Sequence, residues 1–349
     1  MTVSGGTLAV AIAIVAGATL VGVVLFLGHG AGAVVHRHWM GARRATARDD
    51  LLHLAAGAGD RLAHDRVVAS LRRVGRRDRL ALVLELLQSL SGAQAEALAA
   101  AAEEAGAAAE AARWCRSRRW RRRLRGVRAM TLMRRGGDVV PRCFDDAHRE
   151  VRAAAAEWAG ALPTTPRAAA LVGLLDDPEQ LVRLIAMDSL IRSGGLAIDP
   201  LVEAIGAGAG PQALEVAARI GAPGLVPAAV LRLSDPDPRV RLWVERLLGA
   251  VGGEDAVAGL LDGLGDQHPD VRAAAAIGLG RLGHWPAAAR LSERLGDPAW
   301  IVRRDAALAL RALGAPGELM LRRALRSDDG FAIDIARQTL DLPEVVLRA

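Results

Sequence analysis

The segment that decides the fold reads DPAWIVRRDAALALRALG and occupies residues 297–314. An apolar stripe at helical spacing runs through it: Val302, Ala306, Leu310 and Leu313. Asp297 is expected to cap a helix, Pro298 to occupy its first position, and Gly314 to end it. The segment therefore predicts an amphipathic α-helix whose stripe faces a core.

The same pattern recurs along the chain, mostly at intervals of 31 residues. Aspartates share one register at Asp146, Asp177, Asp235, Asp266, Asp297 and Asp328. Five positions after each Asp comes an aliphatic residue: Val151, Val182, Val240, Val271, Val302 and Ile333. An Arg follows in all but the last unit, and Gly closes most units: Arg152, Arg183, Arg241, Arg272 and Arg303, then Gly194, Gly252, Gly283 and Gly314. Such a period is typical of a solenoid, whose units bury their apolar faces by stacking.

Two stretches depart from the pattern. Leu124 and Arg125, with Gly136, fit a unit that lacks its Asp, and residues 209–221 fit a unit that has also lost the Val-Arg pair. Residues 206–211 read GAGAGP, a poor helix interior, because each Gly costs about 1 kcal/mol relative to Ala and Pro about 3 kcal/mol. We expect an irregular turn there.

A second apolar run precedes each Asp, for example at residues 257–264, so each unit is expected to be a pair of antiparallel helices. With Asp266 and Arg272 six positions apart, the array resembles the bacterial HEAT-like repeats of the HEAT-repeat family over residues 117–345. The resemblance implies an all-α fold, an α-solenoid of HEAT-like helical hairpins. It also implies that the second helices line the concave face and that Asp and Arg form a structural ladder between units.

The N-terminal segment predicts a membrane anchor. Residues 7–27 form a run of 21 apolar or small residues, about 31 Å long as a helix, which can span a bilayer. A cleaved signal peptide is the alternative, because residues 31–33 read AGA, but the basic n-region and short apolar core of such a peptide are missing. Four arginines follow the run: Arg37, Arg43, Arg44 and Arg48. By the positive-inside rule, we expect a single-pass plasma-membrane protein with its N-terminus outside and its repeats in the cytoplasm.

These patterns divide the chain into four predicted parts. The membrane anchor occupies residues 1–35 and a basic juxtamembrane linker residues 36–48. Residues 49–112 are helical in pattern but out of register, so we interpret them as a degenerate N-terminal cap. The solenoid takes residues 113–349.

A basic cluster, Arg113–Arg128, contains Trp114 and Trp120. All 45 basic residues of the chain are Arg, and residues 37–160 carry 25 of them against 15 acids. Such a cluster can bind anionic lipid or nucleic acid, or it can be a solvated helix face that pairs with nearby acids. We predict that four of its residues contact the anionic membrane surface: Arg118, Arg119, Arg121 and Arg122.

The second helices predict a protein-binding lining. Positions two, six and nine after each core aliphatic residue are expected on the concave face. They read Gly126, Met130, Met133; Ala153, Glu157, Gly160; Leu184, Asp188, Ile191; Leu242, Arg246, Gly249; Ala273, Ile277, Gly280; Arg304, Leu308, Arg311. This small, apolar, nearly charge-balanced face suits a protein helix better than nucleic acid, which needs Arg along its phosphates. The predicted partner-binding residues are Leu184, Ile191, Leu242, Trp243 and Arg246, although contacts with the adjacent unit would explain the aliphatic ones equally well.

The function expected from the sequence is a membrane-anchored, cytoplasmic, non-catalytic scaffold for protein partners. No cofactor is expected, and His29, His36 and His38 lack the further ligands of a closed metal site. Membrane-anchored bacterial proteins of similar layout are associated with membrane glycosyltransferases, and this resemblance implies a membrane enzyme of that kind as a partner. Two alternatives remain. The runner-up is a nucleic-acid-binding HEAT-repeat protein that uses Arg113–Arg128, against which the membrane tether and the uncharged inner face argue; the third interpretation is an enzyme that resembles the HEAT-like bilin lyases.

The anchor gives a first testable prediction. The full chain should resist carbonate extraction from membranes, because residues 7–27 carry no ionisable side chain. A reporter fused after Ala349 should report the cytoplasm. Recovery of a soluble, exported form that begins near Val34 would contradict this prediction and support the signal peptide.

Overall fold

The structure is a computed structural model that describes residues 61–343. The predicted anchor, the juxtamembrane linker and the first part of the predicted cap lie outside the described residues. Within residues 61–343 every regular element is an α- or 3-10 helix, which confirms the all-α prediction. In this part of the chain, no helix is both long enough and apolar enough to cross a membrane.

The chain divides into two compact units, with the boundary between Gly136 and Gly137. In unit 1 the described helices are α2 (Arg61–Arg73), α3 (Arg76–Leu87), α4 (Gly92–Glu104), α5 (Ala107–Cys115) and α6 (Trp120–Leu132). Leu71 and Leu80 are fully buried in its core. The domain boundary predicted between residues 112 and 113 falls inside α5.

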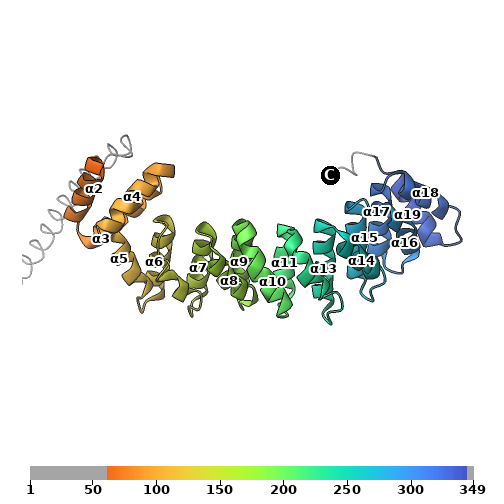
Figure 1. Cartoon of the computed structure of the whole chain (residues 1–349), viewed down its shortest axis with the longest axis horizontal. Coiled ribbons are helices and arrows are strands. Elements are labelled where there is room, and N and C mark those ends of the chain that lie inside the picture. The colour runs from red at the N-terminus through yellow and green to blue at the C-terminus, as the bar shows by residue number, and fades with distance from the viewer. Residues whose placement is uncertain (1–60, 344–349) are drawn as a thin grey trace, which may run out of the picture. The chain divides into compact units, whose positions relative to one another are not determined.

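Unit 2 is a stack of helical hairpins in two layers (Figure 1). One layer, here called the stacked layer, holds the second helices: α7 (Arg149–Ala161), α9 (Gln180–Ser193), α11 (Pro211–Ile220), α13 (Pro238–Val251), α15 (Pro269–Arg281), α17 (Trp300–Ala312) and α19 (Gly330–Leu340). The other layer holds α8 (Thr165–Gly173), α10 (Ile198–Gly206), α12 (Val226–Val230), α14 (Glu254–Gly263), α16 (Ala288–Glu293) and α18 (Ala315–Ala324). Short 3-10 turns join them: Val140–Cys143, Leu174–Asp176, Gly194–Ala197, Pro223–Leu225, Trp285–Ala287 and Arg294–Gly296.

The predicted core register is confirmed in the regular units. On α17 all four stripe residues are buried: Val302, Ala306, Leu310 and Leu313. The closing glycines adopt positive φ, from 54° at Gly194 to 80° at Gly252, which a residue with a side chain rarely does. Gly therefore ends these helices for a backbone reason.

Three details of the register were wrong. Helix α17 begins at Trp300, so Pro298 precedes the helix, and Asp297 accepts the Ala299 amide at 2.9 Å from outside it. In the last unit Asp329, one residue after the predicted Asp328, caps α19 by accepting the amides of Phe331 and Ala332, and Ala332 rather than Ile333 is buried. On α6 the buried residues include Val127, Met130 and Met133 rather than the stripe that starts at Leu124.

The predicted Asp–Arg ladder is present in unit 2. Arg272 donates two hydrogen bonds, each of 2.8 Å, to the carboxylate of Asp297 in the next hairpin, and one of 2.7 Å to the Asp266 carbonyl of its own loop. In the same way, Arg152 donates two hydrogen bonds to the Asp177 carboxylate, and Arg241 donates two to the Asp266 carboxylate. Burial alone would raise the pKa of Asp297, but the hydrogen bond from Arg272 and that from the Ala299 amide bring it below its usual value. The repeated ionisable residues therefore hold neighbouring hairpins together.

The ladder is interrupted at the irregular turn predicted around residue 208. Helix α10 ends at Gly206, and Gly208 has φ of 94°. The regular spacing would place an Asp at position 208, as the partner of Arg183, and an Arg at position 210, as the partner of Asp235. Both positions are Gly: Gly208 and Gly210. Arg232 takes over: it donates to the Asp235 carboxylate at 2.6 Å and to the carbonyls of Ile205 and Ala209. A guanidinium from the following helix pair thus ties the irregular turn.

The packing gives a second testable prediction. Leu279 on α15 is fully buried, whereas Ile277 on the same helix is 44% exposed. Leu279→Ala should lower the free energy of unfolding by about 2–5 kcal/mol because it leaves a cavity. Ile277→Ala, the matched control, should cost less than about 1 kcal/mol. Urea denaturation measures both, and equal losses would mean that the helix register is wrong.

The buried acid Glu245 on α13 gives a third prediction. It is 1% exposed, its Oε2 has no hydrogen-bond partner, and its carboxyl group lies against Gly263, where a side chain would not fit. Burial, and then the charges of Asp266 and Asp262, raise the pKa of Glu245 from 4.5 to about 8. The folded chain therefore keeps a proton that the unfolded chain releases above pH 4.5, so stability falls as pH rises through this window.

Glu245→Gln should remove this pH-dependent loss. At pH 7 the variant should be more stable by about 3 kcal/mol, because pH 7 lies 2.5 units above the ordinary pKa of 4.5 and each unit corresponds to about 1.4 kcal/mol. The advantage should disappear as pH falls toward the ordinary glutamate pKa. Denaturation at several pH values measures it, and a difference that does not change with pH would contradict the assignment.

Candidate functional site

The basic cluster of unit 1 lies at the joint between α5 and α6. These two helices pack closely because residue 126 is Gly: a Cβ there would lie 2.6 Å from the amide nitrogen of Cys115. The short loop between the helices, residues 116–119, and the first turns of α6 then carry most of the arginines on exposed positions. Close helix packing thus concentrates positive charge on one corner of unit 1.

One buried acid neutralises part of this charge. Glu110 on α5 is 7% exposed, forms an ion pair of 2.5 Å with Arg113 and accepts the indole N–H of Trp114 at 2.9 Å. Arg122 lies farther from the same carboxylate, at 3.7 Å. Arg123 donates instead to the carbonyls of Ser117 and Arg118. These groups are engaged within unit 1.

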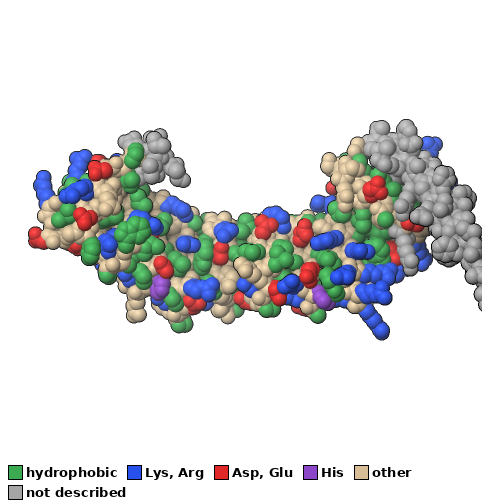
Figure 2. All heavy atoms as spheres, turned by 180° about the vertical axis from the view of Figure 1, so that it is seen from behind, with side chains coloured by type: hydrophobic (Ala, Val, Ile, Leu, Met, Phe, Trp, Pro, Cys, Tyr) green, Lys and Arg blue, Asp and Glu red, His purple; other side chains and the backbone are tan. Residues whose placement is uncertain are grey.

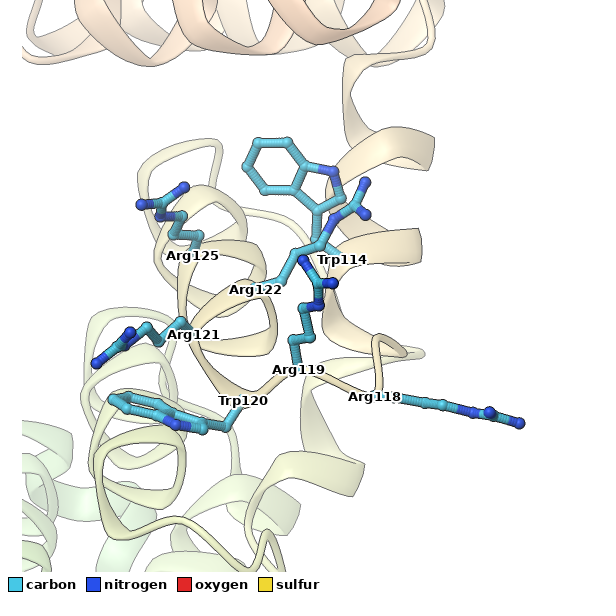
Figure 3. A pocket seen from close by; sticks show the side chains of 7 residues that line it. All are labelled: Trp114, Arg118, Arg119, Trp120, Arg121, Arg122 and Arg125. Atoms are coloured by element: carbon cyan, nitrogen blue, oxygen red, sulfur yellow. The ribbon is translucent and has the colours of Figure 1, made fainter. Parts of the chain in front are cut away.

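Five arginines and two tryptophans line an open hollow of about 720 Å³ (Figure 3). Its lining residues are Trp114, Arg118, Arg119, Trp120, Arg121, Arg122 and Arg125. We call it the arginine hollow. Four of its cations form no ion pair with an acid among residues 61–343: Arg118, Arg119, Arg121 and Arg125.

Two indole rings are part of the arginine hollow. The Arg122 guanidinium lies 5.6 Å from the ring centre of Trp114, and that of Arg121 lies 5.3 Å from Trp120. Figure 3 shows the Trp120 ring beside Arg121 on one side of α6, with Trp114 and Arg122 on the other and Arg118 pointing away from both. These contacts are cation–π pairs, which hold the guanidinium planes in place.

The structure brings together the four predicted membrane-surface residues. Arg118, Arg119, Arg121 and Arg122 all line the arginine hollow. The pairing of Arg122 with Glu110 was not foreseen, although the spacing of Glu110 from Arg113 and Trp114, three and four residues, is that of one helix face. The membrane contact itself stays a prediction.

The predicted protein-binding lining of unit 2 is only partly exposed. Leu184 is 53% exposed and Arg246 is exposed, while Ile191, Leu242 and Trp243 are half-buried. The Arg246 guanidinium covers the Trp243 ring at 4.4 Å. Leu184 and Ile191 belong to α9, and Leu242, Trp243 and Arg246 belong to α13, with α11 between them in the row (Figure 1).

Several residues expected in this lining pack between helices instead. Added side chains would clash with the next helix at Gly160, Gly249 and Gly280: a Cβ at Gly249 would lie 2.5 Å from the Gly278 Cα, and one at Gly280 2.7 Å from the Ala309 Cα. Gly126, Met130 and Met133 are likewise buried in unit 1. These positions are small or buried because neighbouring helices meet there, so their assignment to a partner-facing surface was wrong.

Sequence reasoning missed one exposed residue of α9. Leu181 is 52% exposed and lies on the outward side of the helix with Leu184, Asp188 and Ile191. We call these four residues the α9 stripe. On the face shown in Figure 2, acidic and basic side chains are interspersed over the hairpins of unit 2.

The described residues offer no metal centre: among residues 61–343, no group of three or more His, Cys, Asp or Glu side chains is placed to hold an ion. The three N-terminal histidines lie outside this range. Cys115 and Cys143 are buried and form no disulfide.

These features define an α-solenoid of helical hairpins held by an Asp–Arg ladder. Residues 257–341 match the sequence model of the family described as HEAT repeats, and the ladder spacing continues back to Asp146. Residues 257–341 therefore consist of HEAT repeats.

Solved structures with similar helical arrays include YibA of Escherichia coli, at 20% identity over 75% of this chain and 96% of that chain, with a TM-score of 0.39. A second is the complex of CpcE and CpcF of phycocyanin lyase from Nostoc sp. PCC7120, at 18% identity, 58% and 93% coverage, and a TM-score of 0.36. A third is Kap95p bound to RanGDP, at 12% identity, 82% and 50% coverage, and a TM-score of 0.48. Likeness at this level carries no information on what this chain binds. No curated protein matches the sequence.

Proposed function

We propose that this protein is a non-catalytic docking module for a protein partner, tethered to the cytoplasmic face of the plasma membrane. The tether is the apolar run of residues 7–27, with the arginines that follow it on the cytoplasmic side. The repeats supply a rigid surface, because their recurring acids and arginines are engaged with one another in the ladder. A membrane enzyme, such as a glycosyltransferase, is the partner we favour.

The observation that carries the proposal is the two-sided apolar character of α9. Its inner face buries Val182, Ala186 and Leu190, as the core requires. Its outer face carries the α9 stripe, in which three of the four residues are large and aliphatic. A solvated helix normally presents polar residues on that side, and exposed aliphatic residues at helical spacing suit a partner helix.

The neighbouring helices differ from α9. On α7 the outward residues are Glu150 and Glu157, and on α11 they are Gln212 and Glu215. On α13 they are Leu242, Trp243 and Arg246, and the stacked pair of Trp243 and Arg246 has the residue types that dominate protein interfaces. A partner that lies along the stacked layer would thus contact α9 first through apolar groups and α13 through an aromatic and a cation.

Crosslinking in native membranes tests this proposal. A photoreactive amino acid at Asp188, inside the α9 stripe, should give a discrete protein adduct. The same group at Ala258, exposed on α14 in the other layer, should give none. Leu184→Glu should remove the Asp188 adduct, because a charge at the centre of an apolar contact must be desolvated.

Leu319→Glu is the matched control. Leu319 on α18 is 63% exposed, so the same substitution there should leave both the adduct and the melting temperature unchanged. If the adduct persists in Leu184→Glu, or forms equally from Ala258, the α9 stripe is not the docking surface.

A further inference from the structure

The geometry of unit 1 points to a binding site for the phosphate groups of anionic lipid headgroups in the arginine hollow. This inference rests on the proposed membrane tether, which brings the repeats to a lipid surface. It assigns to particular side chains a recognition site, in place of a diffuse attraction between a basic protein and a membrane.

The charge in the arginine hollow is left unbalanced by the fold. The Glu110 carboxylate, which Arg122 approaches, is already held by Arg113 and the Trp114 indole. Arg118, Arg119, Arg121 and Arg125 occupy exposed positions and form no ion pair with an acid among residues 61–343. In unit 2, by contrast, Arg152, Arg241 and Arg272 each hold a carboxylate with two hydrogen bonds.

The chemistry of the lining selects phosphate. A guanidinium presents a planar set of N–H donors that matches two oxygens of one phosphate. The guanidinium groups of Arg121 and Arg122 lie 5.3 Å and 5.6 Å from the ring centres of Trp120 and Trp114, and these contacts reduce their side-chain freedom before a ligand arrives. The indole rings add flat apolar surface beside the cations, a combination suited to the headgroup level of a bilayer.

The extent of the arginine hollow favours a headgroup over a nucleic acid. All its lining residues fall between Trp114 and Arg125, on the end of α5, one loop and the first turns of α6. A duplex is bound through phosphates spaced along its length, which requires cations on several successive units. In unit 2 the repeat arginines Arg152, Arg241 and Arg272 are instead occupied by Asp. A single compact cluster instead fits one or a few headgroups.

Hydrogen–deuterium exchange of the full chain in lipid nanodiscs tests the inference. In discs of phosphatidylcholine with phosphatidylglycerol, the amides of residues 116–125 should exchange about tenfold more slowly than in pure phosphatidylcholine discs, because each bound Arg adds to the attraction of the anionic surface. Residues of α15 should exchange equally in both. Raising the salt to about 0.5 M should weaken the protection, since screening then acts over a few ångströms.

Paired substitutions separate a site from general electrostatics. Arg121→Gln with Arg125→Gln removes two cations from the arginine hollow and should abolish the protection. Arg116→Gln with Arg128→Gln removes the same charge from exposed positions on the adjoining loop and helix, outside the hollow, and should preserve most of it. Equal losses from the two variants would overturn the site and leave only diffuse attraction.

Two further outcomes are decisive. If duplex DNA protects residues 116–125 in neutral discs more strongly than phosphatidylglycerol does at matched ionic strength, the hollow is a nucleic-acid site and the inference fails. If the chain does not incorporate into discs, the tether fails instead. Phosphatidylglycerol vesicles added to the same chain in solution then test the hollow by itself, and an absence of protection there refutes it.

Discussion

The array in unit 2 depends on one repeated interaction, a buried guanidinium that joins two hairpins. Arg272 connects two adjacent hairpins, since it donates hydrogen bonds to the Asp266 carbonyl in its own loop and to the Asp297 carboxylate in the next loop. Neither charge is in water: the Arg272 side chain is 11% exposed and that of Asp297 is 2% exposed. An ion pair so buried is tolerated only when its geometry is well satisfied, and this condition fixes the spacing from one unit to the next. The Asp also accepts the amide that opens its own helix, so one residue sets the start of a helix and the position of the neighbouring hairpin.

The same dependence explains why α9 is distinctive. The hairpin of α10 and α11 has Gly208 and Gly210 where ladder residues belong, so Arg183 at the start of α9 hydrogen-bonds the carbonyls of its own loop but has no carboxylate in the next unit. Arg232 restores the connection from the far side through Asp235. The α9 stripe therefore lies directly before the hairpin of α10 and α11, where the regular ladder is interrupted. The regular repeats use their recurring charges for stacking, whereas α9 presents Leu181 and Leu184 outward beside the interrupted junction and buries its other side in the core.

Much of this fold could be predicted from residue spacing, because Asp, Val and Gly each have a local physical role that recurs in every unit. The stripe of α17 and the closing glycines followed directly.

The errors arose where local roles are not enough. On α6 no Asp marks the register, and the buried set around Val127 could not be told from a stripe one residue away. The glycines at 160, 249 and 280 are on the side of the helix away from the hairpin core, as helical geometry requires, but a helix in a solenoid also touches the helices before and after it. Because glycine has no side chain, the adjacent helix can approach closely at these positions. A helical wheel gives the direction of each residue around its own helix but does not show which helix packs against it. The basic cluster was visible in sequence, whereas its division into paired and unpaired arginines needed the packing of α5 against α6.

Arginine has opposite consequences in the two units because its surroundings differ. In unit 2 the guanidinium groups of Arg152, Arg241 and Arg272 each meet a largely buried carboxylate, so these pairs stabilise the stack and present little net charge to a partner. In unit 1 close packing at Gly126 concentrates five arginines around two indole rings, and four of these arginines form no ion pair with an acid among residues 61–343. A composition in which every base is Arg therefore does not by itself indicate an anion-binding protein. Whether an arginine cluster can bind an external anion depends on the number of carboxylates within reach of each guanidinium. By that criterion we propose the arginine hollow as a site for an external anion, and the α9 stripe as a surface for the apolar face of a partner helix.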